Sequence, residues 1–228
     1  MKRILLLMAV ALPLVLISCG DDKDEPESPD NHEYVDLGLP SGTLWATCNV
    51  GADSPEQYGD YFAWGETKPK DDYSRNTYKW YNGSMDMLMK YDSDSRYGKG
   101  ELDPEDDAAS TNWGSQWRMP TLEQLQELLE KCDWQRTQKN GVNGRLATGP
   151  NGKSIFFPAA GGRSSQLFND GKCGYYWSRT LCSPSKLVIE SAGQGEAYIL
   201  FQGSQDNEVW YDSRYEGCTV RAVRTSKK

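Results

Sequence analysis

An apolar run at the N-terminus, ending at a cysteine, most restricts what this chain can fold into. Lys2 and Arg3 precede the run, and the segment from Ile4 to Ile17 is almost wholly apolar. Such a segment is too short to cross a bilayer as a permanent helix, but it suits the hydrophobic region of a signal peptide. Residues 1–18 are therefore expected to be a targeting signal that takes no part in the fold.

The residues around Cys19 indicate a lipid anchor. Leu16, Ile17 and Ser18 come directly before Cys19, a pattern typical of bacterial lipoproteins whose cysteine is diacylated and becomes the new N-terminus. A buried helix ending at an incidental cysteine does not fit, because a glycine and two aspartates follow at once. Each buried methylene adds about 0.8 kcal/mol, so two or three acyl chains hold a protein firmly. We predict lipidation of Cys19 and a membrane partner bound through this anchor.

An acidic segment follows the predicted anchor. Residues 20–33 hold seven acidic side chains and one lysine, together with two prolines and no Phe, Trp or Tyr. Such a segment cannot bury enough apolar surface to fold, so residues 19–33 are expected to be a disordered tether. An acidic run at this place is similar to the export signal of Bacteroidetes lipoproteins, which predicts the outer membrane, facing the cell exterior. A plain spacer is the alternative.

Residues 34–228 can form one domain with a sizeable core. The chain has eight Trp and thirteen Tyr, which supply unusually much large aromatic surface. Nucleic acid is excluded as a partner, because phosphate binding needs a clustered basic face and this domain is mildly acidic. Residues 147–154 match a loosened nucleotide-binding loop, but a strand-like run follows them where a helix is required. We therefore predict a hairpin turn and no nucleotide.

Short apolar pieces separated by Gly, Pro, Asn and Asp predict brief strands with frequent turns. Strands on both sides of two central helices favour an α+β domain with largely antiparallel pairing over a doubly wound parallel sheet. A hairpin is expected from the first two strands, 34–37 and 43–46. The further predicted strands span residues 61–64, 144–148, 154–157, 174–180, 196–202, 208–212 and 219–224.

Two helices are predicted from the chemistry of their starts. Asp103 and Pro104 supply a side-chain cap and a proline at the first helical position of the first helix. Thr121 and Gln124 form a capping box at the start of the second. The apolar side chains of the second helix share one face that is expected to pack on a sheet: Leu122, Leu125, Leu128, Leu129 and Cys132.

The domain contains no histidine, because the one histidine of the chain is His32 in the tether. This excludes Ser-His and Cys-His nucleophilic sites and leaves a structural zinc site almost without ligands. Paired carboxylates could still act as acid and base, and the densest acidic cluster runs from Glu101 to Asp107. Acids at a helix start already have a structural explanation, so we assign no catalytic residue.

Oxygen ligands for calcium gather in two places. Residues 92–98 resemble a calcium loop, but Arg96 replaces an acidic or amide ligand and Gly98 comes one place late, which excludes an EF-hand. A looser calcium site stays open, and no other cofactor is expected. Its ligand candidates are Asp92, Asp94, Asp106 and Asp107.

Aromatic side chains provide the remaining signal for binding, because sugar rings stack on Trp and Tyr faces. Four of them lie in polar, turn-rich surroundings and are the ligand-binding candidates: Trp80, Tyr81, Trp210 and Tyr211. Packing in the core is the alternative for each of them. The tryptophans of strand-like or motif segments are expected in the core: Trp45, Trp64, Trp117 and Trp177.

Several motifs occur in order along the domain: YVDLGLPSGTLWATCNVGA at 34–52, YGDYFAWGET at 58–67, DDAASTNWGSQWRMPT at 106–121, PNGKSIFFPAAG at 150–161 and GYYWS at 174–178. They resemble the Fibrobacter succinogenes major paralogous domain. This resemblance implies a fold similar to the C-type-lectin-like and formylglycine-generating-enzyme-like folds, but no activity. The copper-binding cysteine pair of the oxidases and the calcium-type sugar-binding motifs of the lectins are both absent from this sequence.

Five cysteines remain in the domain, so at most two disulfides can form within the chain, and the sequence alone leaves their partners open. Cys48 and Cys132 match positions of the family. With that resemblance we expect Cys48 to pair with Cys132 and Cys173 to pair with Cys182 across a strand end, which leaves Cys218 free.

The expected function is that of a non-enzymatic surface module that binds glycan or protein ligands and serves adhesion or capture. Two alternatives stay open. One is a structural or appendage-associated component of the envelope, and the other is an enzyme on the formylglycine-generating-enzyme-like scaffold.

Overall fold

A computed structural model describes residues 32–85, 88–91, 100–182 and 195–225. The predictions on the signal peptide, on Cys19 and on the calcium candidates Asp92 and Asp94 lie outside these residues. Within the described ranges, no helix is long and apolar enough to span a membrane.

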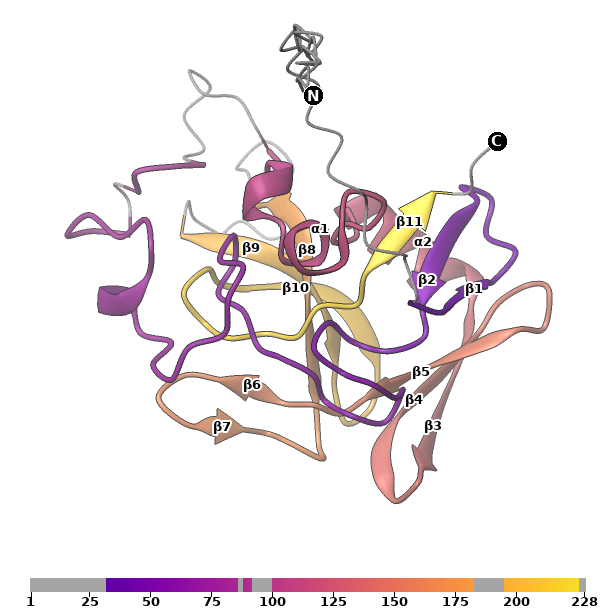
Figure 1. Cartoon of the computed structure of the whole chain (residues 1–228). Coiled ribbons are helices and arrows are strands. Elements are labelled where there is room, and N and C mark those ends of the chain that lie inside the picture. The colour runs from indigo at the N-terminus through magenta and orange to yellow at the C-terminus, as the bar shows by residue number, and fades with distance from the viewer. Residues whose placement is uncertain (1–31, 86–87, 92–99, 183–194, 226–228) are drawn as a thin grey trace, which may run out of the picture.

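Short strands and shorter helices make up the fold (Figure 1). The helices are η1 (Arg75–Thr77), η2 (Pro104–Asp106), α1 (Ala108–Trp113) and α2 (Leu122–Lys131). The strands are β1 (Tyr34–Asp36), β2 (Thr43–Ala46), β3 (Asp133–Lys139), β4 (Val142–Thr148), β5 (Ser154–Pro158), β6 (Gly162–Arg163), β7 (Leu167–Phe168), β8 (Gly174–Leu181), β9 (Glu196–Gln202), β10 (Asn207–Ser213) and β11 (Val223–Thr225).

The strands pair into small antiparallel sheets with the orders β1-β2-β11, β3-β4-β5, β6-β7 and β10-β9-β8. In the first sheet, β2 lies between β1 and β11, so the two ends of the domain meet there. Small antiparallel sheets combined with helices place the protein in the α+β class, as predicted.

Most predicted strands are confirmed, and the first two form the expected hairpin. The segment 61–64 forms only an isolated bridge between Phe62 and Cys218, so its prediction as a strand is wrong. Gly59 and Gly65 flank this segment with positive φ angles of 74° and 77°, and these left-handed turns leave too little extended chain for a ladder. Of the strand predicted at 219–224, only Val223 and Arg224 lie in a strand, which is β11.

Strand β3 was not predicted, and its sequence DWQRTQK explains why. It is the edge strand of its sheet, most of its side chains are exposed, and it therefore lacks an apolar alternation. The turn between β4 and β5 is the predicted hairpin. There, the Gly149 amide donates to the Lys153 carbonyl at 2.9 Å, and no helix follows.

Helix α2 begins as predicted. Thr121 Oγ1 accepts from the Gln124 amide at 3.2 Å, and Gln124 Oε1 accepts from the Thr121 amide at 3.0 Å. The first predicted helix is different, because it divides into η2 and α1. Asp107 caps α1, because its Oδ1 accepts from the amides of Ala109 and Ser110 at 3.0 Å. Asp103 precedes η2 and makes no capping bond there.

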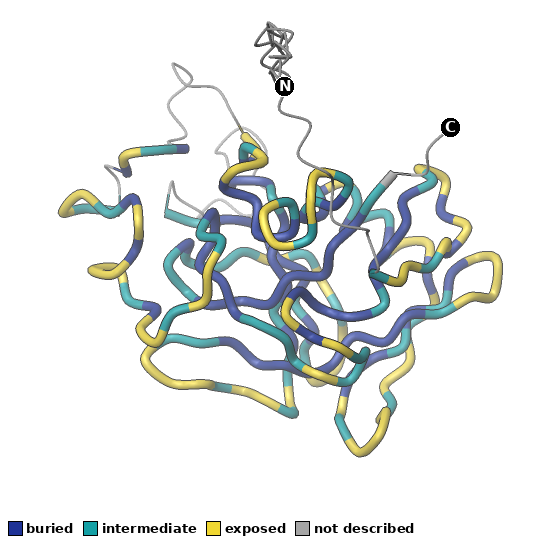
Figure 2. Tube along the Cα trace, viewed as in Figure 1, coloured by how far each residue is buried: buried dark blue, intermediate teal, exposed yellow. Residues whose placement is uncertain are grey.

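The core is rich in aromatic side chains, and buried backbone gathers at the centre of the molecule (Figure 2). The four tryptophans predicted in the core are all fully buried: Trp45, Trp64, Trp117 and Trp177. Two buried arginines connect separate segments. Arg221 Nη2 donates to the Phe156 carbonyl at 3.0 Å, and the Arg214 guanidinium lies 4.7 Å from the Trp64 ring centre.

Candidate functional site

The sheet of β8, β9 and β10 has two different faces, because successive side chains of a strand alternate. Tyr198 and Leu200 of β9 pack in clusters with Leu122 and Leu125 of α2. Ile199 and Phe201 point to the opposite face, where β10 and β7 complete a hollow of about 500 Å³. The part of the sheet against which α2 packs is therefore core, and the other side offers a cavity.

Aromatic rings form most of the wall of this cavity, which we call the aromatic hollow. Trp210 is 41% exposed and lies parallel to the Tyr211 ring, at a centroid distance of 5.2 Å and an angle of 10°. Tyr175 contacts Phe168 at 5.5 Å and Phe201 at 5.1 Å. Rings from β7, β8, β9 and β10 thus offer flat apolar faces around one open space.

Three carboxyl groups line the aromatic hollow, those of Glu208, Asp212 and Glu216, and the last two have raised pKa values. Burial raises the pKa of Asp212 to about 6, although the Ser213 amide donates to its Oδ1 at 2.8 Å. Burial, together with the negative charge of Asp212, raises the pKa of Glu216 to about 7. The buried Glu216 Oε2 has no hydrogen-bond partner, and no cation is found among the residues that line the hollow.

This arrangement has a definite chemical capacity. A group with a pKa near neutrality can donate or accept a hydrogen bond, and Glu216 holds an oxygen without a partner for either purpose. Aromatic faces beside polar groups fit a ligand with apolar C–H faces and hydroxyl edges. The aromatic hollow is therefore suited to a sugar ring.

The four aromatic candidates do not share one surface. Trp210 and Tyr211 line the hollow, but Trp80 is only 5% exposed. The Trp80 ring packs edge to face against Tyr91 at 5.2 Å, and a Cβ at Gly65 would lie 2.2 Å from its indole. The prediction of Trp80 as a ligand-binding residue is therefore wrong, because tertiary packing buries it.

Tyr81 is half-buried and stays a prediction, at a place apart from the aromatic hollow. Its ring packs against the same core cluster as Trp80, and its hydroxyl donates to the Gly83 carbonyl at 3.0 Å. Neither Tyr81 nor Trp80 lines the aromatic hollow.

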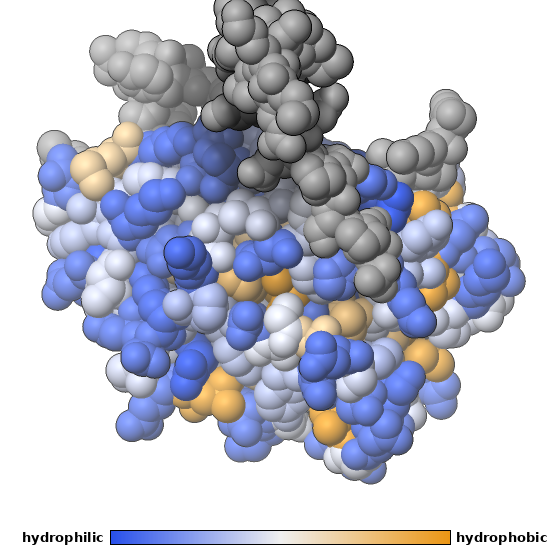
Figure 3. Space-filling model, in the orientation of Figure 1, coloured by the Kyte–Doolittle hydropathy of each residue, from blue (hydrophilic) through white to orange (hydrophobic). Residues whose placement is uncertain are grey.

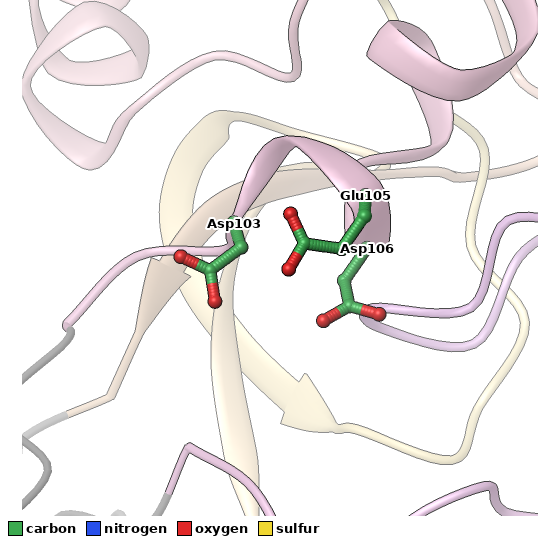
Figure 4. Close-up of side chains that lie close together, drawn as sticks. All are labelled: Asp103, Glu105 and Asp106. Atoms are coloured by element: carbon green, nitrogen blue, oxygen red, sulfur yellow. The ribbon is translucent and has the colours of Figure 1, made fainter.

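The acidic cluster on η2 contains the one group of possible metal ligands found among the described residues. One carboxylate oxygen each of Asp103, Glu105 and Asp106 lie within 4.8 Å of one another, and Figure 4 shows these carboxyl groups gathered at the turn. The Lys90 ammonium already lies among them, 3.1 Å from Asp103 Oδ2 and 2.5 Å from Asp106 Oδ2. Lys79 Nζ contacts Asp106 Oδ1 at 2.8 Å.

The prediction of Asp106 and Asp107 as calcium ligands is contradicted by their partners. Lysines and the Tyr91 hydroxyl bind both oxygens of Asp106. Asp107 is fully buried and accepts from backbone amides, including that of Met119 at 2.9 Å from Oδ2. Calcium ligation requires carboxylate oxygens that are available to the ion, and both aspartates are already committed to structural contacts.

The five cysteines of the domain carry free thiols in this structure. Cys173 and Cys182 lie at opposite ends of β8, so roughly 30 Å of extended chain separates them, whereas a disulfide needs a Cα separation under about 7 Å. That predicted pair is wrong. The other predicted pair is also unbonded: Cys48 Sγ donates to the Ala52 carbonyl at 3.2 Å, and Cys132 packs in the cluster beside α2.

Several residues of the aromatic hollow were not identified from the sequence. Tyr175 and Phe201 lie in predicted strands, Phe168 lies outside them, and nothing local separates the three from core aromatics. Asp212 and Glu216 had one weak signal, since both are acids beside the predicted Trp210 and Tyr211. Their raised pKa values come from burial, which the sequence does not show.

The face of the molecule drawn in Figure 3 is mostly hydrophilic. On the face drawn in Figure 3, apolar side chains occur in small separate patches among hydrophilic ones.

No family model, no curated protein and no solved structure matches this chain.

Proposed function

We propose that this protein binds carbohydrate through the aromatic hollow, as a non-enzymatic module held at the outer face of the outer membrane by acyl chains on Cys19. The observation that carries the proposal is the exposed Trp210, parallel to Tyr211, beside the unpartnered carboxyl oxygen of Glu216. An exposed indole that lies parallel to a second ring and beside polar groups offers a flat apolar face next to hydrogen-bonding groups, which favours a binding role.

The proposed contacts follow from the chemistry of the wall. The C–H face of a sugar stacks on the Trp210 ring, and its hydroxyls donate to the carboxyl groups of Asp212 and Glu216. Glu208 also lines the hollow and is exposed, so it adds an acceptor at the edge. Binding should not require calcium, because the acids of η2 are paired with Lys79 and Lys90.

We also propose a C-type-lectin-like fold within the α+β class. The ordered sequence motifs support this proposal, and the small antiparallel sheets are compatible with it. A protein ligand is the other occupant that this fold suggests, since an aromatic hollow also accepts an apolar side chain.

A glycan array probed with the mature protein tests the proposal. We expect binding to at least one glycan, unchanged by a calcium chelator and weakened about tenfold or more by Trp210→Ala, which corresponds to about 1.4 kcal/mol of lost stacking. The matched control is Tyr34→Ala, which removes an exposed aromatic ring outside the hollow. The absence of any bound glycan, or equal binding by both variants, would overturn the proposal.

The carboxyl pair favours a second function, glycoside hydrolysis. Asp212 and Glu216 both have pKa values raised toward neutrality beside a sugar-sized hollow, and an acid and a base for this reaction need one protonated and one ionised carboxyl group. In that case, Glu216→Gln should abolish release of reducing sugar even at glycan concentrations that saturate the variant, so that the loss lies in the chemical step and not in binding. Intact glycan after prolonged incubation with the unaltered protein would exclude this function.

A further inference from the structure

A second cavity lies on the other side of β9 from the aromatic hollow. It has a volume of about 230 Å³ and shares no lining residue with the hollow. We call it the basic pocket. Its charged side chains are Arg136 of β3, Arg145 of β4 and Lys172 of the turn before β8, and its amide side chains are Gln138, Asn143 and Gln202. Among the residues that line it, three are cations and none is an acid.

The two arginines face one another across a pair of strands. Arg136 and Arg145 are direct register partners in the β3–β4 ladder, a placement in which like charges are destabilising. Arg145 is buried to 7% exposure; its burial and the charge of Arg136 lower its pKa, while Asp206 raises it. A buried cation beside an exposed cation of the same sign favours the binding of an anion between or beside them.

Both guanidinium groups are held in place by the β9–β10 turn. Arg145 Nη2 donates to the carbonyls of Gly203 and Gln205 at 3.0 and 2.9 Å, and Arg136 Nη1 donates to the Ser204 carbonyl. A guanidinium carries five N–H donors, so these bonds position Arg145 and leave donors for a ligand. The cations are thus preorganised and need little ordering on binding.

Gln202 gives the independent sign of a ligand. Its side chain is only 2% exposed and lines the pocket, yet neither its Nε2 nor its Oε1 has a hydrogen-bond partner. A buried amide without partners is costly and calls for an explanation. The neighbouring amides bond elsewhere and not to Gln202: Gln138 Nε2 donates to Asn143 Oδ1 at 2.7 Å, and Asn143 Nδ2 donates to the Gly171 carbonyl at 2.8 Å.

The volume restricts the ligand. One water in the liquid occupies about 30 Å³, so the pocket is too large for a bare ion alone. It is also smaller than the range of about 300–1,000 Å³ that is usual for drug-sized ligands. One charged sugar ring fits between these limits, with an acceptor for the amide of Gln202 and a hydroxyl donor for its carbonyl oxygen.

We propose that the basic pocket binds an acidic sugar, a uronic acid residue, whose carboxylate lies by Arg136, Arg145 and Lys172 and whose ring hydroxyl pairs with Gln202. The carboxylate accepts hydrogen bonds from the cations and from Gln202 Nε2, and a hydroxyl donates to Gln202 Oε1. This inference does not depend on the function proposed for the aromatic hollow, which lies on the opposite face of the sheet.

Isothermal titration calorimetry on the mature protein tests the inference with sodium glucuronate, glucose and inorganic phosphate as probes. We expect glucuronate to bind, glucose not to bind, and phosphate to bind more weakly. Gln202→Leu and Lys172→Gln should each weaken glucuronate binding about tenfold or more, since each removes a hydrogen bond to a charged group. Lys153→Gln is the matched control, because Lys153 is exposed and lies outside both cavities.

Each result has a clear meaning. Failure of glucuronate to bind, or equal loss in Lys153→Gln, overturns the inference. If phosphate binds as tightly as glucuronate, the role of the sugar ring is overturned, because the pocket would then recognise charge alone. Gln202→Leu should keep or raise the melting temperature, since replacing an unpartnered buried amide by a similar apolar shape is not costly. If that variant does not fold, Lys172→Gln decides the outcome.

Discussion

Two regions of this molecule each combine a tryptophan with carboxylates, and they differ in what surrounds them. At η2, Trp80 is buried and Asp106 is bound by Lys79, Lys90 and Tyr91. In the aromatic hollow, Trp210 is exposed and Glu216 has an oxygen without a partner. The residue types are alike, so the tertiary partners alone separate a structural cluster from a candidate site.

The acids of the two regions have opposite pKa shifts. Burial alone would raise the pKa of Asp106, but hydrogen bonds from Lys79, Lys90 and Tyr91 outweigh burial and lower it. Burial raises the pKa of Glu216 to about 7, and no cation lines the hollow to oppose it. In the cluster that is densest in the sequence, lysines therefore compensate the charge of Asp106. The two acids with raised pKa values are Asp212 of β10 and Glu216 in the turn after it.

The largest expected effect distinguishes the two tryptophans. Trp80→Ala should lower the free energy of unfolding by about 4 kcal/mol, because it empties a site packed against Tyr91 and Gly65. Trp210→Ala should lower it by less than about 1 kcal/mol, since the ring is largely exposed. Urea unfolding of both variants measures the difference. Equal losses would mean that the two regions are packed alike.

The second-largest expected effect is a loss of stability on changing Asp106 of η2. Asp106→Asn should destabilise the protein by about 3 kcal/mol, because two lysines and the Tyr91 hydroxyl lose a buried charged acceptor; the figure allows for the partial exposure of the lysines. Glu105→Gln is the control, since Glu105 is mostly exposed and should change stability by less than about 0.5 kcal/mol. If Asp106→Asn destabilises the protein no more than Glu105→Gln does, the lysine contacts do not stabilise this turn.

The smallest expected effect is the pH dependence of stability that Glu216 of the aromatic hollow causes. The folded pKa of Glu216 is raised from 4.5 to about 7, so its contribution to stability is fully present below pH 4.5 and is lost as the pH rises to about 7. Glu216→Gln should remove this loss and stabilise the protein at pH 8 by about 1–2 kcal/mol, a range reduced for the share of the group that water reaches. Melting temperatures of both proteins at pH 5 and pH 8 measure it. A difference between the two proteins that stays constant with pH would contradict the raised pKa.

Local features of the fold could be predicted from the sequence because neighbours in the chain decide them. The capping box of Thr121 and Gln124 and the apolar stripe of α2 depend on contacts three or four residues apart. Strand β9 has the predicted bounds, since apolar and aromatic side chains mark it clearly. The edge strand β3 could not be predicted in this way, because its polar residues owe their conformation to pairing with β4.

Of the four aromatic candidates, Trp210 and Tyr211 line the aromatic hollow. Trp80 and Trp210 both stand in polar, turn-rich sequence, and nothing nearby in the chain shows that Gly65 and Tyr91 close over the first of them. The basic pocket was missed for the same reason. Its cations come from separate strands and a turn, and the domain as a whole is mildly acidic.

The sequence by itself determined the α+β class, the hairpins, the capping of α2 and the placement of four tryptophans in the core, because each depends on local propensity or on burial of apolar surface. Only the tertiary structure decided which acids are paired with lysines, which aromatic rings stay open and where Gln202 is left without partners. Those properties arise from the distances between residues far apart in the chain, and burial then sets their electrostatics.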